Sequence, residues 1–174
     1  MLQTVGGMVD LLSDISSLRV LVAEDDEQLR HFLELKFGLD GFEVQSASDG
    51  IEALSLLQIF DADVLVCDIM MPRMSGLTVC KEIRSNGQNR MLPVILLTAR
   101  SIDEDIEEVL RLGKITYLAK PFDATSLANA VRDAAESAGG KRALLGHPHP
   151  AIPPTSWLHN LGKKPSNVSG EKRV

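Results

Sequence analysis

Four short apolar runs and one more polar strand pattern, each followed by a helix pattern, constrain the fold of this chain more than any other feature of its sequence. The runs are rich in Val, Leu and Ile, and unbroken runs of this kind are typical of strands buried on both faces of a parallel sheet. Between them, apolar residues recur at helical spacing, as Leu29, Phe32, Leu33 and Phe37 do. The pattern predicts strands at 19–23, 42–47, 64–68, 92–97 and 115–119, and helices at 27–37, 49–60, 77–84, 102–112 and 123–137.

This alternation favours one fold class. Five strand–helix units in about 120 residues call for an α/β fold with a doubly wound, five-stranded parallel sheet. Right-handed crossover connections would place helices on both faces of the sheet. We therefore assign residues 18–138 to a single (βα)5 domain.

The two ends of the chain differ from this domain. Residues 1–17 carry apolar residues at helical spacing over a turn or two, and we expect them to be an N-terminal leader. Residues 139–174 are rich in Pro, Gly, His, Asn and Ser, which predicts a flexible tail. The apolar residues around Trp157 leave two interpretations, a docking patch or a solvated tail. The tail is too short and too rich in Pro to be an output domain.

Charge is unevenly distributed along the chain. The tail carries six basic residues against one acidic residue, a net charge of +5, and because the whole chain carries −6, residues 1–138 carry −11. This acidic body argues against direct binding to nucleic acid, which requires clustered Lys and Arg. A hard divalent cation suits it better.

The sequence indicates neither export nor membrane insertion. No apolar run is long enough to cross a bilayer, and the N-terminus lacks the basic segment that begins a signal peptide. Cys67 and Cys80 form neither a metal-binding spacing nor a disulfide framework, and we expect Cys67 to be a small core residue. A reducing cytoplasm is the expected location.

Polar and charged residues stand at the ends of four of the five predicted strands. Glu24 and Asp25 follow the first strand, Asp68 ends the third, Thr98 follows the fourth and Lys120 follows the fifth. The carboxyl ends of parallel strands share one edge of the sheet, where such folds bind their ligands. Asp68 alone could equally cap the next turn. The residues that reach the same edge from the other strands favour a functional site.

This combination of groups suits phosphoryl transfer. Clustered carboxylates either take up protons or bind a cation, and Mg²⁺ prefers oxygen ligands of this kind. A carboxylate can also attack phosphorus and form an aspartyl phosphate. The negative charge that spreads over the phosphoryl oxygens could then be met by Mg²⁺, the Lys120 ammonium group and the Thr98 hydroxyl group.

The same residues strongly resemble the receiver domain of two-component response regulators. Their order and separations also resemble those of the family, with 43 residues from Asp25 to Asp68, 30 from there to Thr98 and 22 more to Lys120. The resemblance covers about residues 18–138. It is carried by the motifs Glu24-Asp25, Asp68-Ile-Met-Met-Pro-Arg-Met-Ser-Gly76, Leu97-Thr98-Ala99 and Tyr117-Leu-Ala-Lys120-Pro121-Phe122.

The resemblance implies a role for each residue of the predicted site. Asp68 would accept the phosphoryl group. Glu24 and Asp25 would hold Mg²⁺ together with Asp68 and the backbone carbonyl of Met70, and Lys120 would pair with the phosphoryl group.

The resemblance also implies a CheY-like, flavodoxin-like sheet with strand order 2-1-3-4-5 and a switching surface. Thr98 would swing toward the phosphoryl group and Tyr117 would then move inward, so that helix 4, strand 5 and helix 5 change as one surface. The Lys120-Pro121 peptide is expected to be cis. Residues 112–116 depart from the small and acidic residues common at this place in the family, which leaves the output face open.

Partners and alternatives follow from the same resemblance. The donor would be a histidine kinase or a histidine phosphotransfer protein, and the output a downstream protein, a missing output domain or a phosphorylation-dependent dimer. Such a module catalyses only its own phosphorylation and dephosphorylation and is not an enzyme with an external substrate.

An unphosphorylated scaffold is one alternative function. A Mg²⁺-dependent aspartyl-phosphate hydrolase is another, but it needs a second carboxylate two residues after Asp68, where Met70 stands. Met70 and Arg100, two residues beyond Asp68 and Thr98, stand at positions that resemble those that set the rate of dephosphorylation in the family.

Overall fold

The computed structural model describes residues 17–85, 89–99 and 103–138 of the chain. The predicted tail, Arg100 and all but the last residue of the predicted leader lie outside these residues. Within them, no helix combines the length and the apolar character needed to span a membrane.

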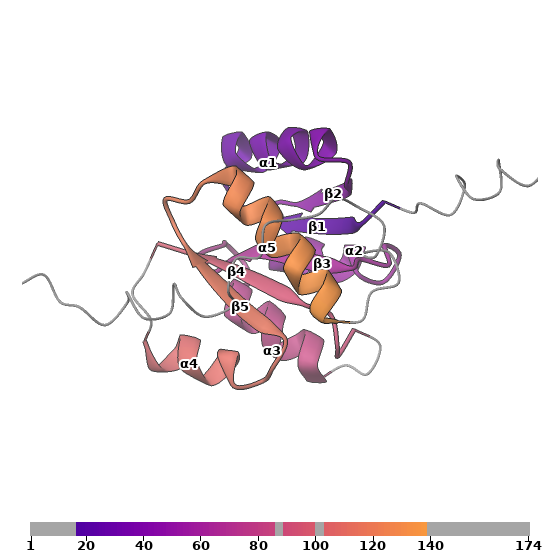
Figure 1. The fold of residues 1–174 in the computed structure, drawn as a ribbon. Helices are drawn as coiled ribbons and strands as arrows, with labels where there is room; N and C mark the ends of the chain where they lie inside the picture. Colours follow the sequence, from indigo (N-terminus) through magenta and orange to yellow (C-terminus); the bar gives the residue numbers. More distant parts are fainter. Residues whose placement is uncertain (1–16, 86–88, 100–102, 139–174) are drawn as a thin grey trace, which may run out of the picture.

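Five parallel strands form one sheet, as the sequence predicts (Figure 1). Their order is β2-β1-β3-β4-β5, which confirms the order implied by the family resemblance. The strands are β1 (Arg19–Ala23), β2 (Glu43–Ala47), β3 (Val64–Asp68), β4 (Val94–Thr98) and β5 (Ile115–Ala119).

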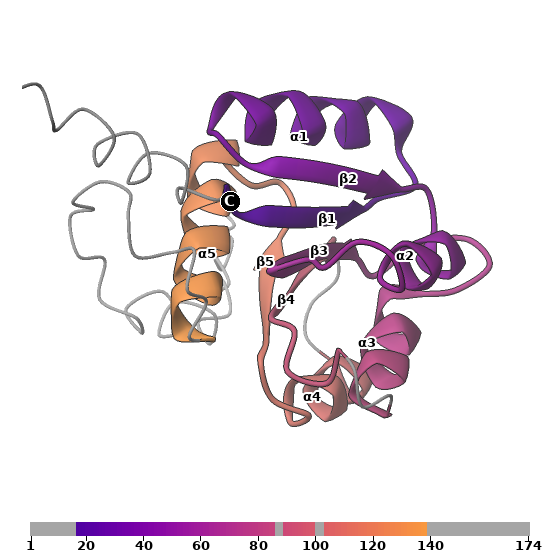
Figure 2. The same cartoon turned by 90° about the vertical axis from the view of Figure 1, so that its right-hand side faces the viewer.

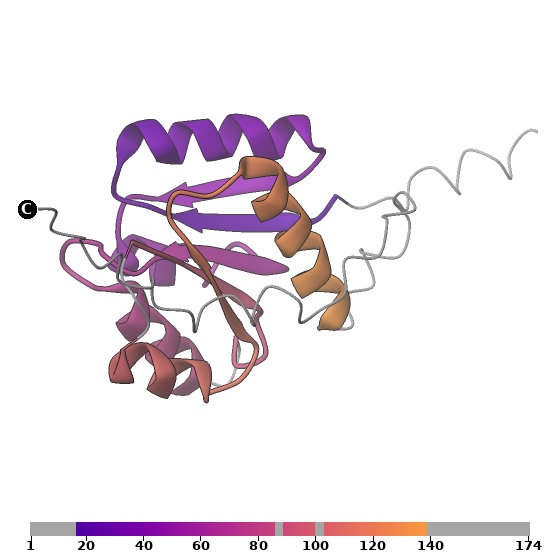
Figure 3. The same ribbon diagram turned by 60° about the vertical axis from the view of Figure 1, so that its left-hand side comes forward.

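Five helices cover both faces of the sheet. α1 and α5 lie on one face, and α2, α3 and α4 lie on the other (Figures 2 and 3). This arrangement is the one that right-handed crossovers produce when the chain winds outward from β1 in both directions. The helices are α1 (Glu27–Leu39), α2 (Gly50–Leu56), α3 (Gly76–Ser85), α4 (Glu104–Leu110) and α5 (Ala124–Ser137).

Strand residues divide between two apolar layers because successive side chains point to opposite faces of a sheet. In β1, Val20 and Val22 pack with α1 and α5, whereas Leu21 and Ala23 pack with α2 and α3. All four are fully buried, as expected for an interior strand of a parallel sheet. Cys67 is buried in the second layer, as predicted.

An aspartate precedes each of four helices and caps its N-terminus. Asp26, for which the sequence suggests only a favourable charge near the helix start, accepts hydrogen bonds from the backbone N–H groups of Gln28 and Leu29 at 2.9 and 3.0 Å. Such caps satisfy backbone donors that have no partner within the helix. The four caps are Asp26, Asp49, Asp103 and Asp123.

The structure differs from several local expectations. The fourth helix ends at Leu110 rather than 112, and the second strand begins at Glu43 rather than 42. The fourth strand begins at Val94 rather than Leu92, because Pro93 has no N–H to donate to the sheet, and it extends to include Thr98. The second helix ends at Leu56 rather than near 60. Phe32 is 50% exposed, because the buried side of α1 is the narrow stripe that contains Leu33 and Phe37.

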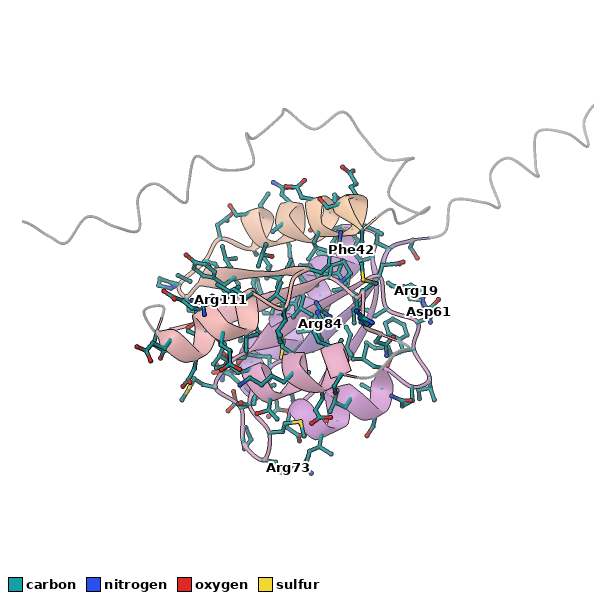
Figure 4. All side chains as sticks on the ribbon, turned by 90° about the horizontal axis from the view of Figure 1, so that it is seen from below. Arg19, Phe42, Asp61, Arg73, Arg84 and Arg111 are labelled. Carbon is teal, nitrogen blue, oxygen red and sulfur yellow. The ribbon has the colours of Figure 1, made fainter. Side chains whose placement is uncertain are left out.

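Arg84 of α3 ties together the amino ends of the last two strands (Figure 4). Its guanidinium group donates hydrogen bonds to the backbone carbonyls of Leu92, Gly113 and Lys114 at 2.8, 3.0 and 3.1 Å. The edge opposite the predicted site is therefore held by a side chain rather than by backbone pairing alone.

Candidate functional site

The predicted site residues meet at the carboxyl edge of the sheet. Parallel pairing places Asp68 of β3 opposite Leu97 of β4, and Thr98 opposite Ala119 of β5. Glu24 directly follows β1, and its backbone N–H donates to the carbonyl of Ala47 at 3.1 Å. Four different strands therefore deliver side chains to one place.

Lys120 lies between two carboxylates. Its Nζ atom donates hydrogen bonds to Oε2 of Glu24 and to Oδ2 of Asp68, each at 2.8 Å. The side chains of Glu24, Asp68 and Lys120 are only 1%, 7% and 21% exposed. Their charges are thus shielded from water and interact more strongly than a surface ion pair would.

Asp25 completes a cluster of three carboxylates. One oxygen each from Glu24, Asp25 and Asp68 lies within 4.8 Å of the others, and Asp25 is exposed whereas the other two are buried. Oxygen donors of this number and spacing, open to solvent on one side, fit a divalent cation that retains some of its waters. Glu24, Asp25 and Asp68 are therefore chemically suited to hold Mg²⁺.

The protonation properties of the cluster follow from burial and charge. Burial raises the pKa of Glu24, as does the negative charge of Asp68, although the hydrogen bond from Lys120 opposes the shift. Burial lowers the pKa of Lys120, but hydrogen bonds to Asp68 and Glu24 raise it, and the net direction is upward. Lys120 is held as a cation and serves as the counterion of the cluster.

The loop between β3 and α3 folds back onto Asp68. Oδ1 of Asp68 accepts a hydrogen bond from the backbone N–H of Met70 at 3.2 Å, and the N–H of Gly76 donates to the carbonyl of Ile69 at 3.1 Å. A Cβ atom on Gly76 would lie 2.2 Å from the backbone oxygen of Asp68. Only glycine allows so close an approach.

Thr98 of β4 and Tyr117 of β5 are both buried. Thr98 is buried, and its backbone carbonyl accepts a hydrogen bond from the N–H of Lys120 at 2.7 Å. Tyr117 is buried in the layer formed with α3 and α4, so its ring already occupies an inward position. The Lys120-Pro121 peptide is cis, as expected.

Comparison with known proteins settles the family. A sequence profile described as the response regulator receiver domain matches residues 20–132, well over half of the chain. The chain belongs to the response regulator receiver family. Response regulator MprA of Mycobacterium bovis is 39% identical over 130 residues, an alignment that covers 70% of this chain and 56% of MprA. The chain thus spans about half the length of the curated relatives it matches.

Solved receiver domains share the fold. The receiver domain of the Francisella response regulator 1452 is 37% identical, with a TM-score of 0.63, over 70% of this chain and 98% of that one. The receiver domain of the sensor histidine kinase PA1611 from Pseudomonas aeruginosa is 28% identical, with a TM-score of 0.63, over 70% of this chain and 99% of that one. The PA1611 structure has a magnesium ion coordinated in its active-site cleft.

One contributor to the receiver site was not predicted from the sequence. Arg30 of α1 donates hydrogen bonds from Nη1 to the backbone carbonyls of Glu24 and Asp25 at 2.8 and 3.3 Å. It holds the segment that presents both acidic side chains and adds a positive charge beside them. The available signal was an arginine one helical turn after Asp26, the residue that follows the Glu24-Asp25 pair.

The raised pKa of Glu24 predicts a pH dependence of stability for this receiver domain. The carboxyl group of Glu24 binds its proton more tightly in the folded state than in the unfolded state, where its pKa is near 4.5. The contribution of Glu24 to the free energy of unfolding therefore becomes less favourable as the pH rises above 4.5. Glu24→Gln removes the titrating carboxyl group and, with it, this pH dependence. In urea denaturation with EDTA, the stability of the variant relative to wild type should rise as pH is raised from the unfolded value to neutrality. If the stability of the variant relative to wild type stays constant or falls over this pH interval, the pKa of Glu24 is not raised in the folded state.

Gly76→Ala tests the close approach behind Asp68. The added methyl group must displace the backbone of Asp68, so we expect a loss of stability of about 2 kcal/mol. Gly38→Ala in α1 is the matched control, since a Cβ atom there meets nothing within 4 Å. Because alanine favours a helix more than glycine, this control should be neutral or stabilising. Urea denaturation measures the stability of both variants. Equal changes in stability would show that the close approach of Gly76 to Asp68 is not the cause.

Proposed function

We propose that this receiver domain takes a phosphoryl group onto Asp68 from a histidine kinase or a histidine phosphotransfer protein. The observation that supports this most directly is the placement of Asp68 at the end of β3. One of its oxygens is 2.8 Å from Lys120 Nζ, and its carboxylate lies in a cluster with Glu24 and Asp25. An oxygen of Asp68 attacks phosphorus, the bond from phosphorus to the donor nitrogen breaks, and its electron pair leaves with the donor imidazole.

Mg²⁺ is the cofactor that we propose for this site. Glu24, Asp25, Asp68 and the backbone carbonyl of Met70 would hold the ion. When bound, the ion neutralises negative charge on the carboxylates and on the phosphoryl oxygens. The oxygen-only donor set and the magnesium ion of the related PA1611 receiver domain support this choice.

The chain's own residues orient the reacting groups. Lys120 holds Oδ2 of Asp68, while the N–H of Met70 holds Oδ1, so the carboxylate is fixed before a donor arrives. We propose that Lys120, whose Nζ atom is 2.8 Å from Asp68, pairs with the phosphoryl group once Asp68 carries it. Thr98, buried at the end of β4, is the hydroxyl group that we expect to turn toward that group.

We propose that phosphorylation acts on the surface formed by α4, β5 and α5. Tyr117 lies buried beneath this surface, so we expect phosphorylation to favour the buried position over an exposed one. Residues 112–116 differ from the small and acidic residues common at this place in the family, so the resemblance does not identify the partner that binds this surface. A downstream protein, an output domain of a longer chain or a phosphorylation-dependent dimer are the candidate outputs.

The same site argues against the two alternative functions. A hydrolase needs a second carboxylate near Met70, whose exposed thioether side chain cannot transfer a proton. An unphosphorylated scaffold would not need the complete set of Glu24, Asp25, Asp68 and Lys120. We therefore propose a switch module without an external substrate, acting in the cytoplasm, with residues 18–138 as the receiver domain between a leader and a tail.

Acetyl phosphate provides a test that needs no cognate kinase. With Mg²⁺, the intact mass of the chain should increase by one phosphoryl group, and EDTA should prevent the increase. An unchanged mass in the presence of Mg²⁺ would favour the scaffold interpretation. An equal increase in EDTA would contradict the metal requirement.

A further inference from the structure

A buried carboxylate outside the acidic cluster contacts the loop that follows Asp68. Asp49 follows β2, and its side chain is 3% exposed. Its Oδ1 atom caps α2 by accepting hydrogen bonds from the N–H groups of Ile51 and Glu52 at 2.8 and 3.1 Å. Its other oxygen, Oδ2, pairs with the guanidinium group of Arg73. One carboxylate therefore caps α2 and also binds a side chain of the β3–α3 loop.

Arg73 stands in the loop that begins at Asp68. Its φ angle is 62°, in the left-handed region that glycine and asparagine adopt far more readily than arginine does. The side chain is 59% exposed, so burial does not explain the choice of residue. Its guanidinium group pairs with Asp49, and a glycine or an asparagine at this position could not form that ion pair.

The two loops also touch at a second point. A Cβ atom on Gly50, the residue after Asp49, would lie 2.6 Å from the backbone oxygen of Met74, the residue after Arg73. The β3–α3 loop is therefore pressed against the start of α2 and fastened there by the ion pair. The same loop contains Met70, whose N–H orients Asp68 and whose carbonyl is a proposed Mg²⁺ ligand.

We propose that the Asp49–Arg73 ion pair is a positioning device that holds the β3–α3 loop against α2 and thereby sets the affinity of the site for Mg²⁺. The proposal rests on the proposed function, since it concerns the same site. Neither residue touches the reacting atoms. Both act through the position of Met70, in the way that outer residues orient the ligands of other metal sites.

Two substitutions separate this role from general stability. Asp49→Asn retains a good helix cap but loses the charge, and Arg73→Gly removes the ion pair while relieving the left-handed backbone. We expect each to weaken Mg²⁺ binding about tenfold, and the double variant to be no weaker than either single variant. Arg73→Gly should keep or raise the melting temperature, which a merely structural contact would lower.

The experiment titrates MgCl₂ into the full chain and follows the backbone amide resonances of residues 68–70 by NMR. Asp61→Asn is the control, since Asp61 is 90% exposed and its nearest charged partner is Arg19 at 3.9 Å, at the opposite edge of the sheet. Affinities of both single variants within about twofold of wild type would overturn the inference, as would additive losses in the double variant. Failure of the wild type to bind Mg²⁺ would overturn the proposed function as well, so the two failures are distinguishable.

Discussion

Asp68→Asn is expected to abolish phosphoryl uptake from acetyl phosphate, with the rate falling at least about a thousandfold. The amide is a poor nucleophile and a poorer metal ligand, yet it has nearly the same size as the carboxylate. Asp68 is 7% exposed and accepts a hydrogen bond on each oxygen, from Lys120 and from the N–H of Met70; the amide oxygen can keep one of them, and the neutral amide removes one negative charge from the buried cluster. We therefore expect a folded but unreactive protein. Intact mass after incubation with acetyl phosphate and Mg²⁺ measures the loss.

Asp61→Asn provides the matched control for this substitution. It makes the same chemical change on an exposed side chain at the far edge of the sheet, and it should be phosphorylated like wild type. If the Asp68→Asn protein gains a phosphoryl group at a comparable rate, another residue is the acceptor and the proposed mechanism is wrong.

Lys120→Met is expected to lower the stability of the metal-free protein by about 3 kcal/mol. The substitution removes the shared partner of Glu24 and Asp68 and leaves two buried carboxylates facing each other without a counterion. A cation that binds the folded state should restore part of this loss, so the variant should be stabilised by Mg²⁺ more than wild type is. Urea denaturation with EDTA and with MgCl₂ measures both effects.

Lys81→Met is the control for the loss of a lysine. Lys81 pairs with Glu108 at 3.1 Å, but the two side chains are 48% and 60% exposed, so its loss should cost less than about 1 kcal/mol. Equal destabilisation by the two substitutions, or a response to Mg²⁺ that does not differ from wild type, would show that Lys120 is not the counterion of the cluster.

The sequence predicted the fold and the edge of the sheet where the site lies because both depend on periodicity. Apolar runs such as 64–67 are typical of strands buried on both faces of a parallel sheet, and the residues that follow parallel strands reach the same edge. The sequence therefore predicted that Asp68, Glu24 and Lys120 lie close together. In the structure, Lys120 is within hydrogen-bond distance of both carboxylates.

What the sequence could not predict depends on contacts between loops. The ion pair of Asp49 with Arg73 carries no periodic signal, because it joins two segments whose relative positions are set by the packed sheet. The contacts of Arg30 are local in the chain, but a single arginine in a helix pattern does not show which backbone carbonyls its side chain reaches. The exposure of Phe32 has a similar cause. Its spacing fits a helix face, but how wide a face is buried depends on how α1 sits against the sheet.

The central claim is that Asp68, and no other carboxylate of the cluster, carries the phosphoryl group. Reduction of the phosphorylated chain with borohydride converts an aspartyl phosphate to homoserine, which peptide mass spectrometry can locate. We predict homoserine at position 68 only when acetyl phosphate and Mg²⁺ are both present. Homoserine at position 25, or none at any aspartate of a protein whose intact mass has increased, would contradict the account.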